Sequence, residues 1–344
     1  MKIHSIAFGA SAMLLFACEN PMTLKTDVHE DGSLDKAIIF EKKDSSILKN
    51  NMFNVSDGKG WSVTMDKLPP DGKDKEKDNY WVQFSKHFNS VDEMNTELNT
   101  GADTLFSIRS SFEKKFRGFY TYIRYAETFM PINRFKMLAA TDYFNREDFQ
   151  FIDRLPNEGS AISKADSVYL QMLNIKIQDN YANMAIFNEQ FDILKQLVTR
   201  SNLDRRWLDT LQKRKEFIFK LVDKMKGDGE FALKVADTLG IPLPREKAIR
   251  DEEELSKGFD ARLSFMSFAK DGHYKNIIQM PWEVVDSNAD SVSGNQLFWR
   301  PFSTKFIFTE YVMYAESRRL NVGFTLIAGF VLLLTLFVWL RKRP

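Results

Sequence analysis

Residues 321–340 (NVGFTLIAGFVLLLTLFVWL) contain no charged side chain, and the basic stretch RKRP follows them at 341–344. A helix of this length rises about 1.5 Å per residue and so reaches across the ~30 Å hydrocarbon core of a bilayer. A buried helix of a globular domain is the alternative, but such a helix usually has a polar face, and this segment has none. The segment therefore predicts a transmembrane helix followed by a short cationic tail.

The start of the chain has the pattern of an exported protein. A basic residue precedes an apolar run over residues 6–16, and the sole cysteine, Cys18, follows closely. A positive start, an apolar stretch and a small residue before the cleavage point describe a secretory signal. Leu15 and Ala17 stand where the bacterial lipobox has its apolar and small residues, and this resemblance implies a signal peptide over 1–17 and lipidation of Cys18. An ordinary signal peptide with a chance cysteine is the alternative.

Together the two ends predict where the chain lies. The signal exports the N-terminal side, so residues 19–320 are expected in the periplasm and the basic tail 341–344 in the cytoplasm, as the positive-inside rule favours. We therefore expect an inner-membrane protein that is both lipid-anchored and single-pass. Four cytoplasmic residues are too few for a signalling domain. A single cysteine also rules out an intrachain disulfide.

The charge balance excludes one class of partner. The chain has 48 basic and 47 acidic residues, a formal charge of +1, so no bulk field attracts nucleic acid. With 30 phenylalanines against 10 prolines and 16 glycines, it has the apolar residues that a packed core needs. We expect the membrane, and another envelope protein, as partners. The sequence leaves the oligomeric state open.

Hydrophobic periodicity divides the part before residue 321 into three regions. Period-two alternation, typical of strands, occurs near both ends, whereas the middle has the period of helices. Asp31-Gly32 predicts a hairpin turn, and Glu113-Lys114-Lys115 a second one. Strands are expected within 24–42, 60–66, 80–88, 104–112, 116–129, 274–285, 296–301 and 305–319, and helices within 90–98, 145–152, 163–199, 204–225, 229–239 and 245–269.

These regions predict an α+β fold. A mixed or antiparallel β domain is assembled from both chain ends, with an all-α helical insertion and a C-terminal transmembrane helix. An isolated hairpin is marginally stable, so the late strands are expected to complete a sheet begun by the early ones. Two sequential domains are the alternative. The expected boundaries are 1–17 (signal peptide), 18–130 and 272–320 (β domain), 131–271 (insertion), 321–340 (membrane helix) and 341–344 (tail).

Several motifs resemble a known family. VHEDGSLDKAIIF after the lipobox, and MPWEVVDSNADSVSGNQLFW before the C-terminal apolar run, resemble the LppM-like domain of bacterial lipoproteins. FRGFYTYIRYAETF and YVMYAESRRLN are similar to segments of uncharacterised Bacteroidota lipoproteins with a C-terminal transmembrane helix. The chain departs from the family in having Pro281-Trp282 where Pro-Gly is usual. The resemblance covers about 24–130 and 274–340, and it implies no enzymatic activity.

The residues themselves indicate little chemistry. His29, His87 and His273 have no spacing typical of a metal site, so we predict no metal and no cofactor. The chain lacks a Gly-x-Ser-x-Gly elbow, although a hydrolase site dispersed along the sequence stays open as an alternative. The leading prediction is a non-enzymatic envelope lipoprotein that binds or scaffolds at the periplasmic face of the inner membrane.

Two segments are candidates for binding. Tyr120, Tyr122, Arg124 and Tyr125 could form an aromatic platform for a glycan, peptide or lipid. Alternating aromatic residues on a strand also pack beneath other elements, and this second interpretation is favoured. Residues 250–265 could offer an acidic docking face, but acidic residues early in a helix usually interact with its dipole and with solvent.

Overall fold

The computed structural model describes residues 20–43, 45–49, 51–69, 79–99, 106–158, 160–224 and 231–342. The predicted signal peptide, Cys18 and most of the loop before residue 79 lie outside the described residues. The fold is α+β and divides into two compact units. One, the sheet unit, lies within 19–132, 156–160 and 272–344, and the other, the helical unit, includes 133–155 and 161–271.

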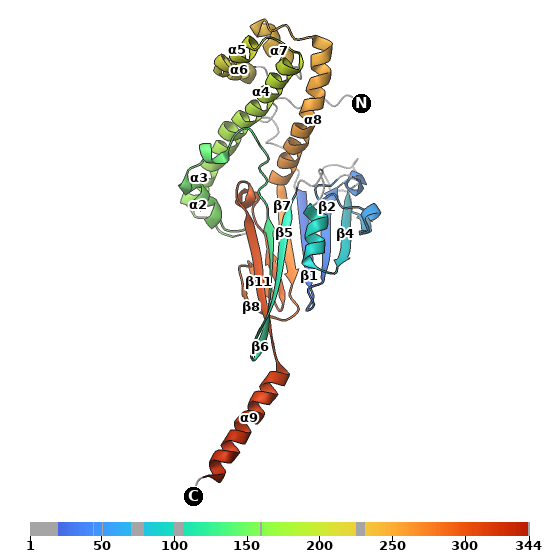
Figure 1. Ribbon diagram of the computed structural model, residues 1–344, viewed down its shortest axis with the longest axis vertical. Helices are drawn as coiled ribbons and strands as arrows, with labels where there is room; N and C mark the ends of the chain where they lie inside the picture. Colours follow the sequence, from blue (N-terminus) through green and yellow to red (C-terminus); the bar gives the residue numbers. More distant parts are fainter. Residues whose placement is uncertain are drawn as a thin grey trace. The chain divides into compact units, whose positions relative to one another are not determined.

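The larger sheet of the sheet unit is mixed and contains strands from both ends of the chain. Its order is β3 (Ser62–Lys67), β4 (Tyr80–Phe88), β2 (Leu34–Lys43), β1 (Asn20–Val28), β7 (Gly272–Gln279), β10 (Gln296–Trp299) and β9 (Ser291–Ser293). Strand β1 runs parallel to β7, and the other pairs are antiparallel. In Figure 1 the blue strands from the start of the chain lie beside the orange β7.

The second sheet is antiparallel and is likewise built from both chain ends. Its order is β5 (Ile108–Arg117), β6 (Tyr120–Phe129), β11 (Tyr311–Leu320) and β8 (Glu283–Ser287). Strand β6 pairs with β11 over its full length, from Tyr120↔Leu320 to Phe129↔Tyr311. The pairings β1–β7 and β6–β11 confirm the predicted assembly of the β part from early and late strands.

The turn of the β5–β6 hairpin differs from the prediction. Arg117 pairs with Tyr120, so the turn is the two-residue loop Gly118-Phe119 and not Glu113-Lys114-Lys115. Gly118 has φ of +61°, as the first central residue of a tight hairpin turn requires. The three charged residues instead continue β5, where their side chains are exposed. Charged residues are common on edge strands, because they discourage pairing with another chain.

The late hairpin also differs from the prediction. Strand β7 ends at Gln279 and pairs with β10, whereas Glu283–Ser287 forms β8 in the other sheet. The break falls at Met280-Pro281, because proline has no N–H to donate to a sheet ladder. The single strand expected over 274–285 is therefore two strands in two sheets.

Helix α1 (Val91–Asn99) covers part of the exposed edge of β5. Its N-terminus is capped by the Ser90 hydroxyl, which accepts from the Glu93 N–H at 3.2 Å. The Asn95 amide pairs with the N–H and C=O of Ser110 at 2.7 and 2.8 Å, and Asn99 donates to the Ile108 carbonyl at 2.9 Å. These side chains take the place of a neighbouring strand.

Residues 156–160 belong to the sheet unit, although the sequence places them inside the helical insertion. The Glu158 N–H donates to the Arg300 carbonyl at 2.7 Å, and the Glu158 carboxylate contacts His273 at 2.6 Å. Asn157 donates to Asp290. Short polar contacts of this kind between remote segments leave no periodic signal in the sequence.

The helical unit packs around one apolar cluster, which includes Phe187, Leu194, Ile218, Val235 and Phe259. Its helices are α2 (Arg146–Arg154), α3 (Lys164–Ile175), α4 (Asn183–Arg200), α5 (Arg206–Lys213), α6 (Lys215–Lys224), α7 (Phe231–Leu239) and α8 (Arg245–Lys270). The helix expected over 163–199 is interrupted by a π-helical segment, Lys176–Ala182. The helix expected over 204–225 is broken at Arg214.

Helix α9 (Val322–Arg341) follows β11. By length and composition it could cross a membrane, and no other helix among the described residues passes the same test. None of its residues is buried, so its apolar side chains have no protein core to pack against. This distinguishes α9 from the core helix of a globular domain, which buries one face.

Candidate functional site

Three of the four predicted platform residues share one face of the four-stranded sheet. Tyr120, Tyr122 and Arg124 alternate along β6 with residues that are buried. We call their side of the sheet the outer face. Tyr125 lies on the opposite side and is 0% exposed. Tyr125 is therefore removed from the predicted platform, because strand alternation carries it into the core.

Arginine side chains stack against the tyrosines of the outer face. The Arg117 guanidinium lies 5.1 Å from the Tyr122 ring centroid, and that of Arg318 lies 4.7 Å from the Tyr120 ring. The two tyrosine rings are 6.3 Å apart. Each cation is thus held over an aromatic ring in the manner of a cation–π contact. Among the described residues, neither Arg117 nor Arg318 forms an ion pair.

Arg124 has a different environment on the same face. Its guanidinium lies 4.4 Å from the Tyr314 ring centroid and 3.8 Å from the Glu316 carboxylate. Sequence reasoning did not find Arg117, Arg318 or Tyr314. The register of β6 with β5 and β11 places them beside the tyrosines, and this register joins residues from opposite ends of the chain.

The outer face lies next to the start of α9. The Asn321 N–H donates to the Phe119 carbonyl at 2.7 Å, and the Asn321 side chain donates to the Gly118 carbonyl at 2.8 Å. The same side chain accepts from the Thr121 hydroxyl at 2.7 Å. The Phe324 ring packs on Phe119 at 5.2 Å between centroids. These contacts fix the tip of the β5–β6 hairpin to the first turn of the apolar helix.

Trp282 forms a second contact near α9. Its indole N–H donates to the Glu30 carboxylate at 2.7 Å, and Arg319 donates to the same oxygen at 2.6 Å. The Arg319 guanidinium also lies 4.6 Å from the Trp282 ring centroid. Trp282 thus ties the turn after β1 to the end of β11.

Tyr125 takes part in a fully buried ionic network. Lys36 on β2 donates to the Glu127 carboxylate on β6 at 2.8 Å, and both side chains are 0% exposed. The Tyr125 hydroxyl donates to the same carboxylate oxygen at 2.9 Å, and so does Thr26 at 2.5 Å. Asn276 on β7 donates to the other oxygen at 3.2 Å. This network joins the inner faces of the two sheets.

Burial and charge act in opposite directions on the Glu127 carboxyl. Loss of water raises its pKa, but the Lys36 charge and the hydrogen bonds it accepts outweigh this, so its pKa lies below the ordinary 4.5. Burial, followed by the charge of Glu127, raises the pKa of Tyr125 well above 10. Glu127 is therefore ionised and Tyr125 neutral near pH 7. Enclosed on all sides, the network has a structural role.

The structure brings two of the three described histidines, His29 and His87, close together, although their spacing in the sequence predicts no metal site. His29 and His87 both contact the Asp35 carboxylate, at 2.7 and 2.8 Å, and these three side chains could hold a metal ion. His273 lies apart from them and pairs with Glu158. Spacing along the chain does not reveal the trio, because pairing of β2 with β4 creates it.

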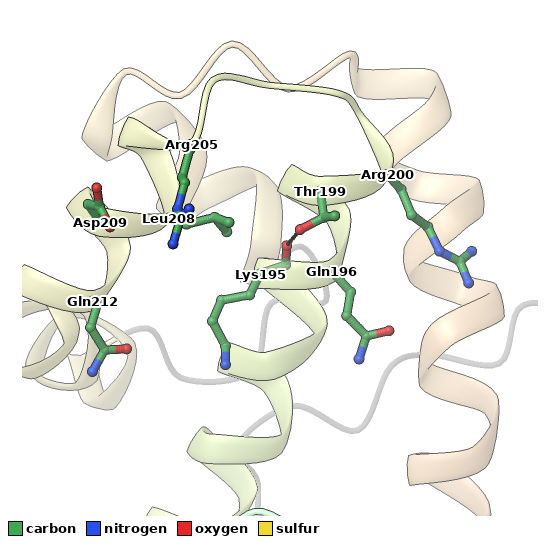
Figure 2. A pocket seen from close by; sticks show the side chains of 8 residues that line it. All are labelled: Lys195, Gln196, Thr199, Arg200, Arg205, Leu208, Asp209 and Gln212. Atoms are coloured by element: carbon green, nitrogen blue, oxygen red, sulfur yellow. Dashed lines mark hydrogen bonds between the residues drawn. The ribbon is translucent and has the colours of Figure 1, made fainter.

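A shallow hollow of about 510 Å³ lies between α4 and α5 of the helical unit. Figure 2 shows its side chains spread along both helices without converging on one point. Two of its three cations have acidic partners, Lys195 with Asp192 and Arg200 with Glu254. The hollow therefore gathers no set of side chains at one point.

The predicted docking segment 250–265 lies within α8, and its side chains point in several directions. Arg262 pairs with the buried Glu189 at 2.6 Å, and Glu254 pairs with Arg200 at 3.2 Å. Phe259 and Phe265 are buried. Part of the segment therefore contributes to packing within the helical unit, whereas Glu253, Glu254 and Asp260 are exposed.

Comparisons with known proteins add one similarity. No protein-family model matches the chain, and no curated protein matches it. Among solved structures, the chain is similar to the NMR structure of the folded domain of LppM from Mycobacterium tuberculosis. The match has 8% identity and a TM-score of 0.29, over 91% of this chain and 97% of that one. A superposition this loose carries no argument about fold or function, so the LppM-like resemblance rests on the sequence motifs.

Proposed function

We propose that the protein is a non-enzymatic LppM-like lipoprotein of the cell envelope, a binding or scaffolding module at the periplasmic face of the inner membrane. In this proposal α9 spans the membrane and Cys18 carries a lipid. The absence of any buried residue along the apolar helix α9 supports the membrane helix. The lipobox pattern supports the lipid anchor.

The orientation can be tested with reporter fusions. A reporter that is active only in the cytoplasm should be active after Pro344 and silent after Arg319, because α9 lies between the two positions. Activity only after Arg319 would contradict the proposed orientation, and activity at both positions would show that the signal does not export the chain.

The outer face of the four-stranded sheet is the proposed binding surface. The observation that carries this proposal is the pair Arg117 and Arg318. Each is stacked on a tyrosine and lacks an acidic partner among the described residues. The Arg318 Nε is buried without a hydrogen-bond partner in the same part of the chain. Buried polar groups normally find a partner, so an incoming acceptor would complete the site. We propose an acidic segment of another envelope protein as the ligand.

Site-specific crosslinking in cells tests this proposal. A photoreactive phenylalanine in place of Tyr122 should capture a protein partner, and Arg117→Glu with Arg318→Glu should reduce the yield at least tenfold. Arg206→Glu with Arg250→Glu is the matched control, because it reverses two arginine charges on the helical unit. Equal yields in both double variants would refute the proposal. Crosslinking to lipid alone would show that the face contacts membrane headgroups instead of a protein.

The absence of an activity is also part of the proposal. The described histidines, His29, His87 and His273, all contact carboxylates. Among the described residues, none of them hydrogen-bonds to a serine or threonine hydroxyl, which a Ser-His-Asp hydrolase requires. No observation favours the hydrolase alternative.

A further inference from the structure

The trio His29, Asp35 and His87 is assembled by the larger sheet. His29 is the first residue after β1, Asp35 is the second residue of β2, and His87 lies near the end of β4. Asp35 and His87 are direct cross-strand partners. The turn after β1 is held by hydrogen bonds between the His29 and Ser33 backbones and between His29 and Gly32. Asp35 alternates with the buried Lys36, so it faces away from the core.

The geometry suits a small cation. His29 Nε2 lies 2.7 Å from Asp35 Oδ2, and His87 Nδ1 lies 2.8 Å from Asp35 Oδ1. One ligand atom from each residue can be chosen so that all three lie within 4.8 Å of one another. Tetrahedral Zn²⁺, bound at about 2.0–2.2 Å, places its ligand atoms about 3.3–3.6 Å apart. Small side-chain rotations would give this arrangement.

Exposure leaves room for water to complete the coordination. The side chains of His29, Asp35 and His87 are 43%, 50% and 53% exposed, so an ion can enter without opening the fold. Asp27 is the direct cross-strand neighbour of Asp35 on β1. Its Oδ1 atom is buried and has no hydrogen-bond partner in the described part of the chain. Its other oxygen, Oδ2, pairs with the Lys25 ammonium at 3.0 Å, so the Asp27 charge is balanced and the trio itself supplies the ligands.

We propose that His29, Asp35 and His87 bind one divalent transition-metal ion, with Zn²⁺ the best suited. Two imidazole nitrogens and one carboxylate oxygen are ligands that Zn²⁺ accepts, and the hard ions Ca²⁺ and Mg²⁺ prefer oxygen alone. The ion would link the β1–β2 turn to β4. Glu30 in the same turn contacts Arg319, so the site would also steady the turn beside the start of α9. This inference does not depend on the proposed binding face.

Metal titration of the full chain in detergent tests the site. The protein should carry a purification tag without histidines. Co²⁺ should produce saturable visible absorption bands at one ion per chain, and Zn²⁺ should abolish them by displacement. His29→Gln with His87→Gln should weaken Zn²⁺ binding at least 100-fold, and Asp35→Asn at least tenfold. His273→Gln is the matched control and should leave binding unchanged, since His273 pairs with Glu158 away from the trio.

A measurement on the unaltered chain keeps the test decisive if a variant fails to fold. Zn²⁺ should protect His29 and His87, but not His273, from modification by diethylpyrocarbonate, as read by peptide mass spectrometry. Modification of all three histidines at the same rate with and without Zn²⁺ would overturn the proposal. Undiminished Zn²⁺ binding by the folded His29→Gln, His87→Gln variant would overturn it as well.

Discussion

Replacing Lys36 by methionine should reverse the way in which stability depends on pH. The substitution keeps the apolar stem but removes the only cation hydrogen-bonded to Glu127 among the described residues. Three hydrogen-bond donors remain, from Thr26, Tyr125 and Asn276. They stabilise the carboxylate without neutralising it. Removing one member of a buried ion pair typically costs about 3–5 kcal/mol, because the other charge stays behind without water.

The sign follows from the Glu127 pKa. In the wild type this pKa lies below 4.5 when folded, so its stabilising contribution is fully present above pH 4.5 and is lost as the pH falls through the folded-state value. In Lys36→Met, burial without a counter-charge should raise the folded-state pKa above its unfolded value. The variant should then be most stable at low pH and lose stability as the pH rises toward 8.

Urea unfolding of the full chain in mild detergent measures both effects. The fluorescence of Trp61 and Trp299, which are buried in the sheet unit, reports on the unfolding of that unit. Trp207 and Trp339 lie outside the two sheets and are replaced by phenylalanine, so that they do not contribute to the signal. Unfolding at pH 5 and pH 8 gives the pH dependence. Lys25→Met is the matched control, since the half-exposed Lys25–Asp27 pair should contribute at most about 1 kcal/mol.

The double variant Lys36→Met, Glu127→Gln separates charge from packing. It leaves no buried charge in the network, so much of the lost stability should return and the pH dependence between 5 and 8 should return to that of the wild type. A loss below about 1 kcal/mol in Lys36→Met, or an unchanged pH dependence, would refute the reasoning. Either result would mean that water reaches the Glu127 carboxylate.

Three further substitutions test other features. Asn321→Ala removes the side-chain bonds that fix the hairpin tip to α9, so the N–H of residue 321, which donates to the Phe119 carbonyl, should lose protection against amide exchange while the circular dichroism spectrum stays unchanged; unchanged protection would contradict the role of this joint. Asn95→Ala leaves the Ser110 N–H and C=O on β5 without their partner, so the free energy of unfolding in urea should fall by about 1–3 kcal/mol. The uncovered strand edge should also promote concentration-dependent association. Cys18→Ala should abolish labelling by a fatty-acid probe, and equal labelling of both proteins would exclude lipidation there.

Local sequence was sufficient for several elements. The β1–β2 turn, the helix starts after Ser90 and Asn145 and the apolar helix α9 occur where their residues predict them. In each case the determining interaction spans only a few residues, such as a side chain that caps the next turn of helix. The α+β class followed from the change of hydrophobic period along the chain. Because the late strands need partner strands to be stable, the sequence also indicated that both chain ends contribute to one sheet.

Tertiary structure decided which residues meet. Register placed Arg117 and Arg318 against Tyr122 and Tyr120, and it carried Tyr125 into the core. If the pairing of a strand shifts by one residue, the side chains that faced the core face the solvent instead. Which residues share one face of a sheet therefore depends on how the strands pair, and the sequence of a single strand does not determine this pairing. The trio of His29, Asp35 and His87 and the Lys36–Glu127 pair arise in the same way. These contacts join residues far apart in the chain, because hydrogen bonding between strands is specific in geometry but indifferent to sequence separation.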